Sequence, residues 1–130
     1  MGIAKNSIKI CAWNISKGLI RKLHDKDFLQ IVSEYDILCF SECWVKCPNE
    51  FELPGYEKYY VSRSKCNGGG VVLFYKKWLN NYIKVIKNEA DCMIWFKVDK
   101  IIMPNNMDLY MCVIYMPPDK NIFYTKYNIY

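Results

Sequence analysis

Apolar residues occur in short runs separated by Gly, Pro and Asn, which is the pattern of strands joined by tight loops. The runs of strand length span residues 8–15, 37–40, 59–62, 71–75, 93–98 and 109–115. Between the first two runs, Phe28, Leu29, Ile31 and Val32 are spaced as on one helix face, with Asp25 or Asp27 as the cap. The order strand, helix, strand and then mostly strands predicts an α/β (α+β) fold with a helix packed on a mixed sheet. Residues 121–130 lack Gly and Pro and are compatible with the start of another helix.

Composition narrows the class of protein. The chain has 130 residues, of which 52% are hydrophobic and 24% charged, so it can bury a core. The net charge of +5 mildly favours a polyanionic partner, although a solvated Lys-rich surface is the simpler explanation of the charge alone. No signal peptide and no apolar stretch of roughly 18 residues is present, which predicts no membrane partner. We interpret the 7 cysteines as free thiols of an intracellular, reducing compartment.

Three polar side chains stand at the ends of apolar runs. Asn14 ends the first run, Glu42 follows the second, and Tyr115 ends the last. Open α/β sheets build ligand sites at the carboxyl ends of their strands, so these are candidate site residues. A carboxylate directly after a buried run needs a partner, and Mg²⁺, which prefers hard oxygen ligands, would supply one. The alternative is that Glu42 is merely the first exposed residue after a strand.

Short motifs give these residues a context. Segments 12–15, 18–19 and 36–44 read Ala-Trp-Asn-Ile, Gly-Leu and Asp-Ile-Leu-Cys-Phe-Ser-Glu-Cys-Trp. They resemble the opening of the endonuclease/exonuclease/phosphatase superfamily, and above all the endonuclease domains of non-LTR retrotransposons. The resemblance continues through segments 53–56, 68–72, 94–99 and 115–118. No single motif is decisive, but the ordered set covers nearly the whole chain.

The resemblance implies a two-sheet sandwich flanked by helices, like that of deoxyribonuclease I, of which this chain would supply roughly the first sheet and its helix. It implies an endonuclease that hydrolyses phosphodiesters in DNA with Mg²⁺, or alternatively Mn²⁺. Glu42 would be the metal ligand, Asn14 a polar partner of metal or phosphate, and Tyr115 a contact to the scissile phosphate or a hydroxyl that holds the site together. The parent element would act in the nucleus. The sequence does not say whether a reverse transcriptase follows.

The chain also departs from the family pattern. One residue appears inserted between Asn14 and Gly18, Cys43 replaces the usual Thr, and Pro118 stands where repair-type relatives have Asn. The family's later Asp-x-Asn motif, which positions and activates water, is not identified, and the Ser-Asp-His motif, which stabilises phosphate charge, does not occur; His24 is the only histidine. We therefore expect residues 1–130 to be a partial domain, truncated at the C-terminus and inactive alone.

Two other functions stay open at this point. The chain would equally suit a fragment of a phosphatase of the same superfamily, acting on lipid or inositol phosphates. It would also suit a non-catalytic remnant of a decayed element. The sequence decides neither of these, nor whether the chain is an enzyme by itself, nor its oligomeric state.

Other residue clusters are weaker signals. Cys39, Cys43 and Cys47, with Cys66, are spaced as zinc ligands on a helix, but their segment is expected to be strand and loop without a C-x-x-C pair. The glycines at 68–70 would cradle phosphate or, more simply, lead into the next strand.

Aromatic and cationic side chains offer a further set of weak signals. Most aromatics are expected in the core, and Trp44 is the one beside the predicted site. Arg63, Lys65 and the pair Lys76-Lys77 are either DNA-phosphate contacts or solvated surface.

Overall fold

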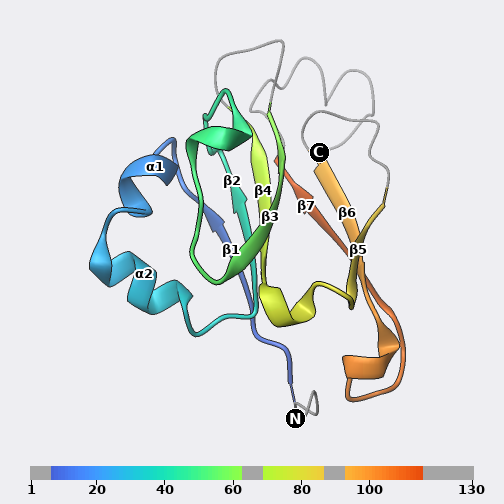
Figure 1. Cartoon of the computed structure of the whole chain (residues 1–130). Coiled ribbons are helices and arrows are strands. Elements are labelled where there is room, and N and C mark those ends of the chain that lie inside the picture. Colours follow the sequence, from blue (N-terminus) through green and yellow to red (C-terminus); the bar gives the residue numbers. More distant parts are fainter. Residues whose placement is uncertain (1–6, 63–68, 87–92, 116–130) are drawn as a thin grey trace, which may run out of the picture.

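The computed structural model describes residues 7–62, 69–86 and 93–115 (Figure 1). In chain order the elements are β1 (Ile10–Asn14), α1 (Leu19–Lys22), α2 (Lys26–Val32), β2 (Ile37–Ser41), η1 (Pro48–Glu50), β3 (Tyr56–Val61), β4 (Val71–Lys76), η2 (Lys77–Leu79), β5 (Ile83–Val85), β6 (Met93–Val98), η3 (Lys100–Ile102) and β7 (Leu109–Ile114). Sheet A has the order β1-β2-β4-β3 and sheet B the order β5-β6-β7. The predicted α/β fold of two sheets with helices is confirmed.

Sheet A places two strand ends side by side. β1 and β2 run parallel, because α1 and α2 carry the chain back between them. Ile10 pairs with Ile37 at one end and Asn14 with Ser41 at the other. β4 runs antiparallel to β2 and β3 and therefore begins where β2 ends. We call this end of sheet A, with the carboxyl ends of β1 and β2, the site end.

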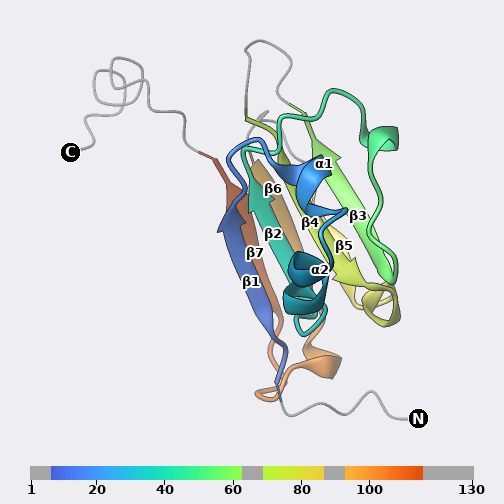
Figure 2. The same ribbon diagram turned by 90° about the vertical axis from the view of Figure 1, so that its left-hand side faces the viewer.

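The central strands of sheet A, β2 and β4, are buried on both faces (Figure 2). Phe40 and Phe74 belong to a core under the helices, whereas Cys39 and Leu73 belong to a second core against sheet B. This double burial explains why residues 37–40 form an unbroken apolar run. The expectation that the chain holds only the first sheet is wrong, because β5, β6 and β7 form a second sheet over the inner face.

Sheet B is covered on one face. Ile94, Phe96 and Val98 alternate inward and are fully buried, while Trp95 between them is 43% exposed on the outer face. Tyr110 of β7 is 59% exposed. The alternation of buried and exposed residues along the chain is therefore clear in the strands of sheet B and absent in the central strands of sheet A.

Helix α2 is capped by Asp25, one of the two caps that the sequence predicts. The Asp25 side chain accepts hydrogen bonds from the backbone N–H groups of Asp27, at 2.9 Å, and of Phe28, at 3.5 Å. Phe28 and Val32 are buried, but Ile31, which we expected on the same face, is 54% exposed. The buried stripe of α2 is thus narrower than the sequence pattern indicated.

Some boundaries differ from the prediction. α1 and β5 were missed, because four and three residues are too short to show a period. β3 begins at Tyr56 rather than at Tyr59, because Tyr56 and Glu57 still pair with β4. The predicted helix in residues 121–130 lies outside the described residues. In the described part of the chain, every helix is too short or too polar to cross a membrane.

Candidate active site

Asn14 and Glu42 meet at the site end. Asn14 closes β1 beside Ser41, and Glu42 follows Ser41 directly. The Asn14 Nδ2 donates a hydrogen bond to Glu42 Oε2. The Oδ1 of the same amide accepts hydrogen bonds from the backbone N–H of Ser16, at 3.0 Å, and from its hydroxyl, at 3.3 Å. The amide is held from both sides and fixes the Glu42 carboxylate at the end of β1.

The loops after β1 and β2 carry backbone strain. Ser16 and Lys17 in the first loop, and Glu42 and Trp44 in the second, have φ angles of 52°, 56°, 55° and 56°. Asn106 is the other non-glycine residue with positive φ in the described part of the chain. Such a conformation costs about 1–3 kcal/mol per residue and concentrates at functional sites. The sequence did not reveal Ser16 and Lys17 as site residues, although the extra residue noted between Asn14 and Gly18 falls in this loop.

The strain at Glu42 changes the face on which its side chain lies. Leu38 and Phe40 point toward the helices, so a continued strand would send residue 42 to the same face. The φ of 55° interrupts this alternation and brings the carboxylate to Asn14 instead. The strained backbone is therefore what joins the two predicted site residues.

Backbone hydrogen bonds impose this conformation. They join the two strained loops to each other, and they join the second loop to the glycine turn before β4. The bonds run from Lys17 N to Glu42 O (2.7 Å), from Cys43 N to Gly70 O (3.2 Å) and from Trp44 N to Gly69 O (2.9 Å). In the described part of the glycine turn, the carbonyls of Gly69 and Gly70 bind the loop after β2, and both residues lead into β4.

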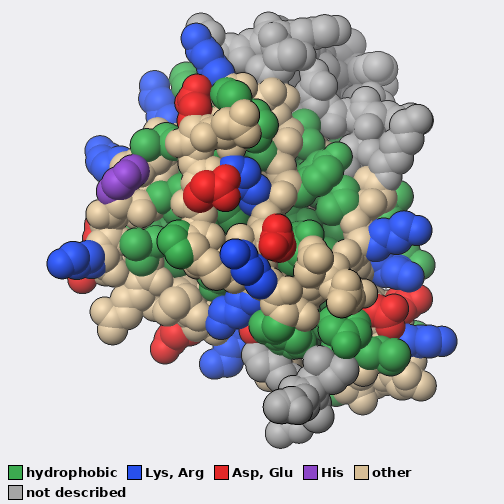
Figure 3. All heavy atoms as spheres, in the orientation of Figure 1, with side chains coloured by type: hydrophobic (Ala, Val, Ile, Leu, Met, Phe, Trp, Pro, Cys, Tyr) green, Lys and Arg blue, Asp and Glu red, His purple; other side chains and the backbone are tan. Residues whose placement is uncertain are grey.

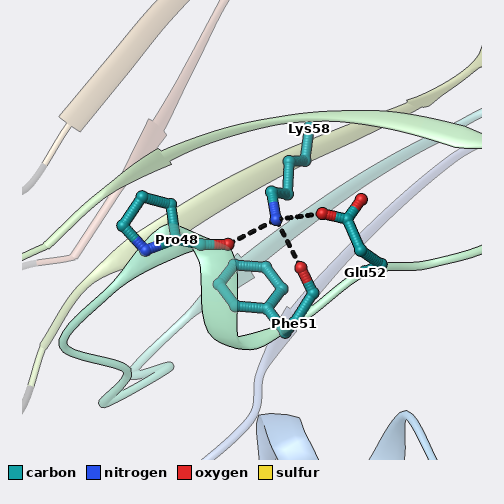
Figure 4. A network of polar contacts seen from close by, with 4 residues as sticks. All are labelled: Pro48, Phe51, Glu52 and Lys58. Atoms are coloured by element: carbon teal, nitrogen blue, oxygen red, sulfur yellow. Dashed lines mark hydrogen bonds and ion pairs between the residues drawn. The ribbon is translucent and has the colours of Figure 1, made fainter.

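Two side chains of β3 anchor the chain that follows Trp44. The Tyr60 hydroxyl accepts a hydrogen bond from Val45 N, at 3.1 Å, and donates one to Val45 O, at 2.5 Å. The Lys58 ammonium group contacts the carbonyls of Pro48 and Phe51 and the carboxylate of Glu52 (Figure 4). These contacts hold the segment after Trp44 against β3.

An exposed tryptophan stands two residues after Glu42. The Trp44 ring is 40% exposed, and the Lys17 ammonium lies 4.3 Å from the ring centroid. Trp13 has the same exposed fraction, but its ring packs on Phe28, with 5.4 Å between centroids. Trp13 therefore covers the core under α2, and the Lys22 ammonium also lies 5.1 Å from its ring centroid. Among the described residues, the ring contact found for Trp44 is with Lys17.

Tyr115 directly follows β7, in the other sheet. It is half-buried and packs against the core between the sheets. Both views show that β1, β2 and β7 end at the same end of the molecule (Figures 1 and 2). The role of Tyr115 at the phosphate stays a prediction, and its neighbours 116–118 lie outside the described residues.

The weaker candidates of the sequence fall elsewhere. His24 is exposed on the surface, as expected, where its Nδ1 shares a hydrogen bond with Ile20 O at 2.8 Å. Lys76 lies at the end of sheet A opposite the site end, where its backbone N–H donates to Asp36 O. This position separates Lys76 and Lys77 from Glu42. Arg63 and Lys65 lie outside the described residues.

The cysteines show no zinc site in the described part of the chain. Cys11, Cys39, Cys43, Cys47 and Cys112 are not joined in disulfides, while Cys66 and Cys92 lie outside that part. Burial raises the pKa of both Cys39 and Cys43 to about 12, so each stays protonated near neutral pH. Zinc binds the thiolate, which makes these two buried thiols poor ligands.

The donors at the site end suit an open Mg²⁺ site rather than a closed cage. Among the described residues, no group of three His, Cys, Asp or Glu side chains lies together. Mg²⁺ is usually held by one or two carboxylates with water and substrate phosphate, so Glu42 alone fits this chemistry. The Asn14 Oδ1 is engaged by Ser16, and a direct contact of Asn14 to the metal stays a prediction.

Comparisons with known proteins agree with the fold. A search of curated proteins found no match. The AP endonuclease LMAP from Leishmania major superposes with a TM-score of 0.68 at 13% identity, over 93% of this chain and 45% of that one. The APE2 catalytic domain from Xenopus laevis gives a TM-score of 0.59 at 18% identity, over 85% of this chain and 45% of that one. The chain thus spans less than half the length of either structure.

Sequence comparison defines the family. The pattern of the endonuclease/exonuclease/phosphatase family matches residues 11–105, a segment that includes Asn14, the strained loops and Glu42. The match covers most of the chain and agrees with the two-sheet fold. The chain belongs to the endonuclease/exonuclease/phosphatase family.

Proposed function

We propose that this chain forms the metal-binding part of a Mg²⁺-dependent DNA phosphodiesterase of the non-LTR retrotransposon type. The observation that carries the proposal is Glu42, a carboxylate on strained backbone that Asn14 holds at the site end. Membership of a nuclease and phosphatase family supports phosphodiester chemistry. DNA is favoured as substrate because the similar structures are AP endonucleases, and the ordered motifs favour the retrotransposon type.

The residues present have distinct tasks in this proposal. Glu42 would hold the ion through its carboxylate, and Asn14 would keep that carboxylate in place through its amide. When bound, Mg²⁺ polarises the phosphodiester and stabilises charge on the leaving oxygen. A carboxylate that is fixed in advance needs little rearrangement when the ion and the phosphate arrive. Tyr115 would contact the phosphate from the end of β7.

Metal binding tests the proposal directly. Mg²⁺ titrated into the protein and followed by calorimetry, or Mn²⁺ by electron paramagnetic resonance, should show weak binding that Glu42→Gln removes. Asn14→Ala should weaken binding by about tenfold, because removing the partner that orients a ligand typically has this effect. Glu52→Gln is the matched control, since its carboxylate is 73% exposed and pairs with Lys58. Unchanged binding in Glu42→Gln would reject the site.

We also propose that the 130-residue chain does not cleave DNA by itself. General-base catalysis and charge stabilisation in the transition state each contribute about hundredfold or more. The sequence has one histidine, His24, which lies on the surface after α1 and bonds to Ile20 O. A weakly held metal at Glu42 does not replace both contributions. In a supercoiled-plasmid assay with Mg²⁺, nicking by the wild-type chain that Glu42→Gln loses would contradict this proposal.

A further inference from the structure

Trp44 is presented to solvent by a rigid part of the structure. It stands two residues after Glu42, its ring is 40% exposed, and its backbone φ is 56°. Its N–H is bound to Gly69 O at 2.9 Å, and the residue that follows is held by Tyr60. The backbone of this loop therefore holds an aromatic face open to solvent two residues from a candidate catalytic carboxylate.

One cation lies against this ring, and two more are exposed in the neighbouring segments. Lys17 places its ammonium 4.3 Å from the ring centroid, and its backbone N–H is bound to Glu42 O. Lys46, two residues after Trp44, and Arg21 of α1 are also exposed. Along the edge of the molecule that carries α1 and α2, Lys and Arg side chains lie among Asp and Glu side chains (Figure 3). An aromatic face next to solvated cations is the combination with which proteins bind a nucleic-acid strand.

We infer that Trp44 and Lys17 bind one unpaired nucleotide of the DNA next to the phosphate at Glu42. The base stacks on the Trp44 ring, and the Lys17 ammonium contacts a backbone phosphate. This inference rests on the proposed function for the identity of the substrate, but it concerns strand recognition rather than metal binding. It names Trp44 and Lys17 as binding residues and an unpaired base as the feature that they recognise.

A base can replace the Lys17 ammonium on the Trp44 ring. An exposed cation–π contact is weaker than the stacking of a base on an aromatic ring. A base can therefore take the place of the ammonium on the ring, and the ammonium gains a charge-assisted hydrogen bond to phosphate. The positive φ and backbone bonds of Trp44 hold the ring ready, which reduces the ordering that binding requires.

The ring selects unpaired bases for a geometric reason. A base inside a duplex is already stacked on both faces, whereas a base in a single strand or at an unpaired position has a face free for Trp44. Single strands and duplexes with one unpaired base both present a base with a free face. A fully paired blunt duplex has no such base and should bind through phosphate contacts alone.

Fluorescence anisotropy of a labelled oligothymidine, titrated with the 130-residue chain in EDTA, tests the inference without metal. We expect Trp44→Ala to weaken binding by about tenfold and Trp44→Phe to keep most of it. Lys17→Gln should weaken binding severalfold and reduce its dependence on salt. Trp95→Ala, with a ring of similar exposure (43%) on the outer face of sheet B, should leave binding unchanged.

A second variant protects the test against misfolding. Trp44→Leu keeps an apolar side chain but has no aromatic face, so it should bind as weakly as Trp44→Ala while circular dichroism stays that of the wild type. A blunt duplex should bind more weakly than the single strand and should not respond to Trp44→Ala. Wild-type protein that ignores the oligothymidine, or Trp44→Leu protein that binds it fully, overturns the inference.

The result is separable from the metal site. If Glu42-dependent Mg²⁺ binding is present but oligothymidine binding does not depend on Trp44, only the inference about the strand fails. If oligothymidine binding depends on Trp44 but Glu42→Gln leaves Mg²⁺ binding unchanged, the inference holds and the proposed phosphodiesterase function fails.

Discussion

β2 has a carboxylate at each end, and the surroundings of the two are opposite. Asp36, directly before β2, is fully buried, and its Oδ2 accepts the backbone N–H of Lys9 at 2.8 Å. Glu42, directly after Ser41, is half-buried and has left-handed backbone with φ of 55°. Its side chain is bound by the Asn14 amide at the site end.

The difference separates a structural acid from a functional candidate. The backbone of Asp36 is also bonded on both sides, from its N–H to Lys9 O and from Lys76 N–H to its carbonyl. A buried acid that accepts a hydrogen bond from a backbone N–H gives that donor the partner it needs away from water, and so stabilises the fold. An acid on strained backbone costs stability, and such residues persist where function needs them.

The largest expected effect is therefore at Asp36. Asp36→Ala should lower the free energy of unfolding by about 3 kcal/mol, because a fully buried carboxylate is removed and the part-buried Lys9 N–H loses its acceptor. Glu42→Gln should change it by less than about 0.5 kcal/mol, as is usual away from the core. Urea unfolding of both variants measures the difference. Equal losses in the two variants would remove the distinction between the two acids.

Tyr56 sharpens the comparison at the Asp36 end. Its hydroxyl lies 2.9 Å from Val32 O and 2.7 Å from Tyr35 O, so it binds carbonyls at the end of α2. Burial, and after it the charge of Asp36, raises the pKa of Tyr56 from 10.0 to about 12. The native state therefore keeps this proton more tightly than the unfolded chain. Its contribution to stability is complete below about pH 10 and is lost as the pH rises toward about 12.

Tyr56→Phe should consequently have two effects. Near neutral pH it should lower the free energy of unfolding by about 1 kcal/mol, through the lost hydrogen bonding. Between about pH 10 and about pH 12 its stability should fall less steeply than that of the wild type. Urea unfolding across this range gives both values. The free energy of unfolding of Tyr56→Phe should still fall with rising pH, since burial also raises the pKa of Tyr60 and Tyr75. Parallel curves for the two proteins would show that Tyr56 does not retain its proton.

Much of the fold could be predicted from local patterns. The boundaries of β6 at Met93 and Val98 match the prediction, because alternating burial in a sheet with one covered face is visible in the sequence. The Asp25 cap was equally local. The presence of second-sheet strands within this chain was not expected, because packing of residues 93–98 against residues 71–75 is a long-range contact that no short pattern encodes.

The candidate site was predicted by type of residue but not by geometry. Asn14 and Glu42 stood out because each ends an apolar run and because the motifs resemble a known family. The positive φ angles of Ser16, Lys17 and Trp44 left no mark, because glycine, the residue that usually signals this conformation, is absent at these positions. The joining of Asn14 to Glu42 depends on those angles, so it appears only in three dimensions.

The smallest expected effect tests whether Glu42 costs the fold stability. Glycine has no Cβ to clash at φ of 55°, so Glu42→Gly should relieve about 1–3 kcal/mol of strain. The greater freedom of glycine in the unfolded chain and the lost hydrogen bond to Asn14 should offset about 1–2 kcal/mol of this gain. We therefore expect a net stabilisation of about 0.5 kcal/mol, together with complete loss of Mg²⁺ binding. Asn106→Gly is the control, because Asn106 has φ of 54° in another loop and asparagine tolerates this conformation. It has little strain to relieve, so the greater freedom of glycine should lower the stability of Asn106→Gly by about 0.5–1 kcal/mol. If thermal unfolding shows that Glu42→Gly is clearly less stable than the wild type, the loop does not store strain at Glu42. The carboxylate would then be a structural residue like Asp36, and the contrast between the two ends of β2 would no longer hold.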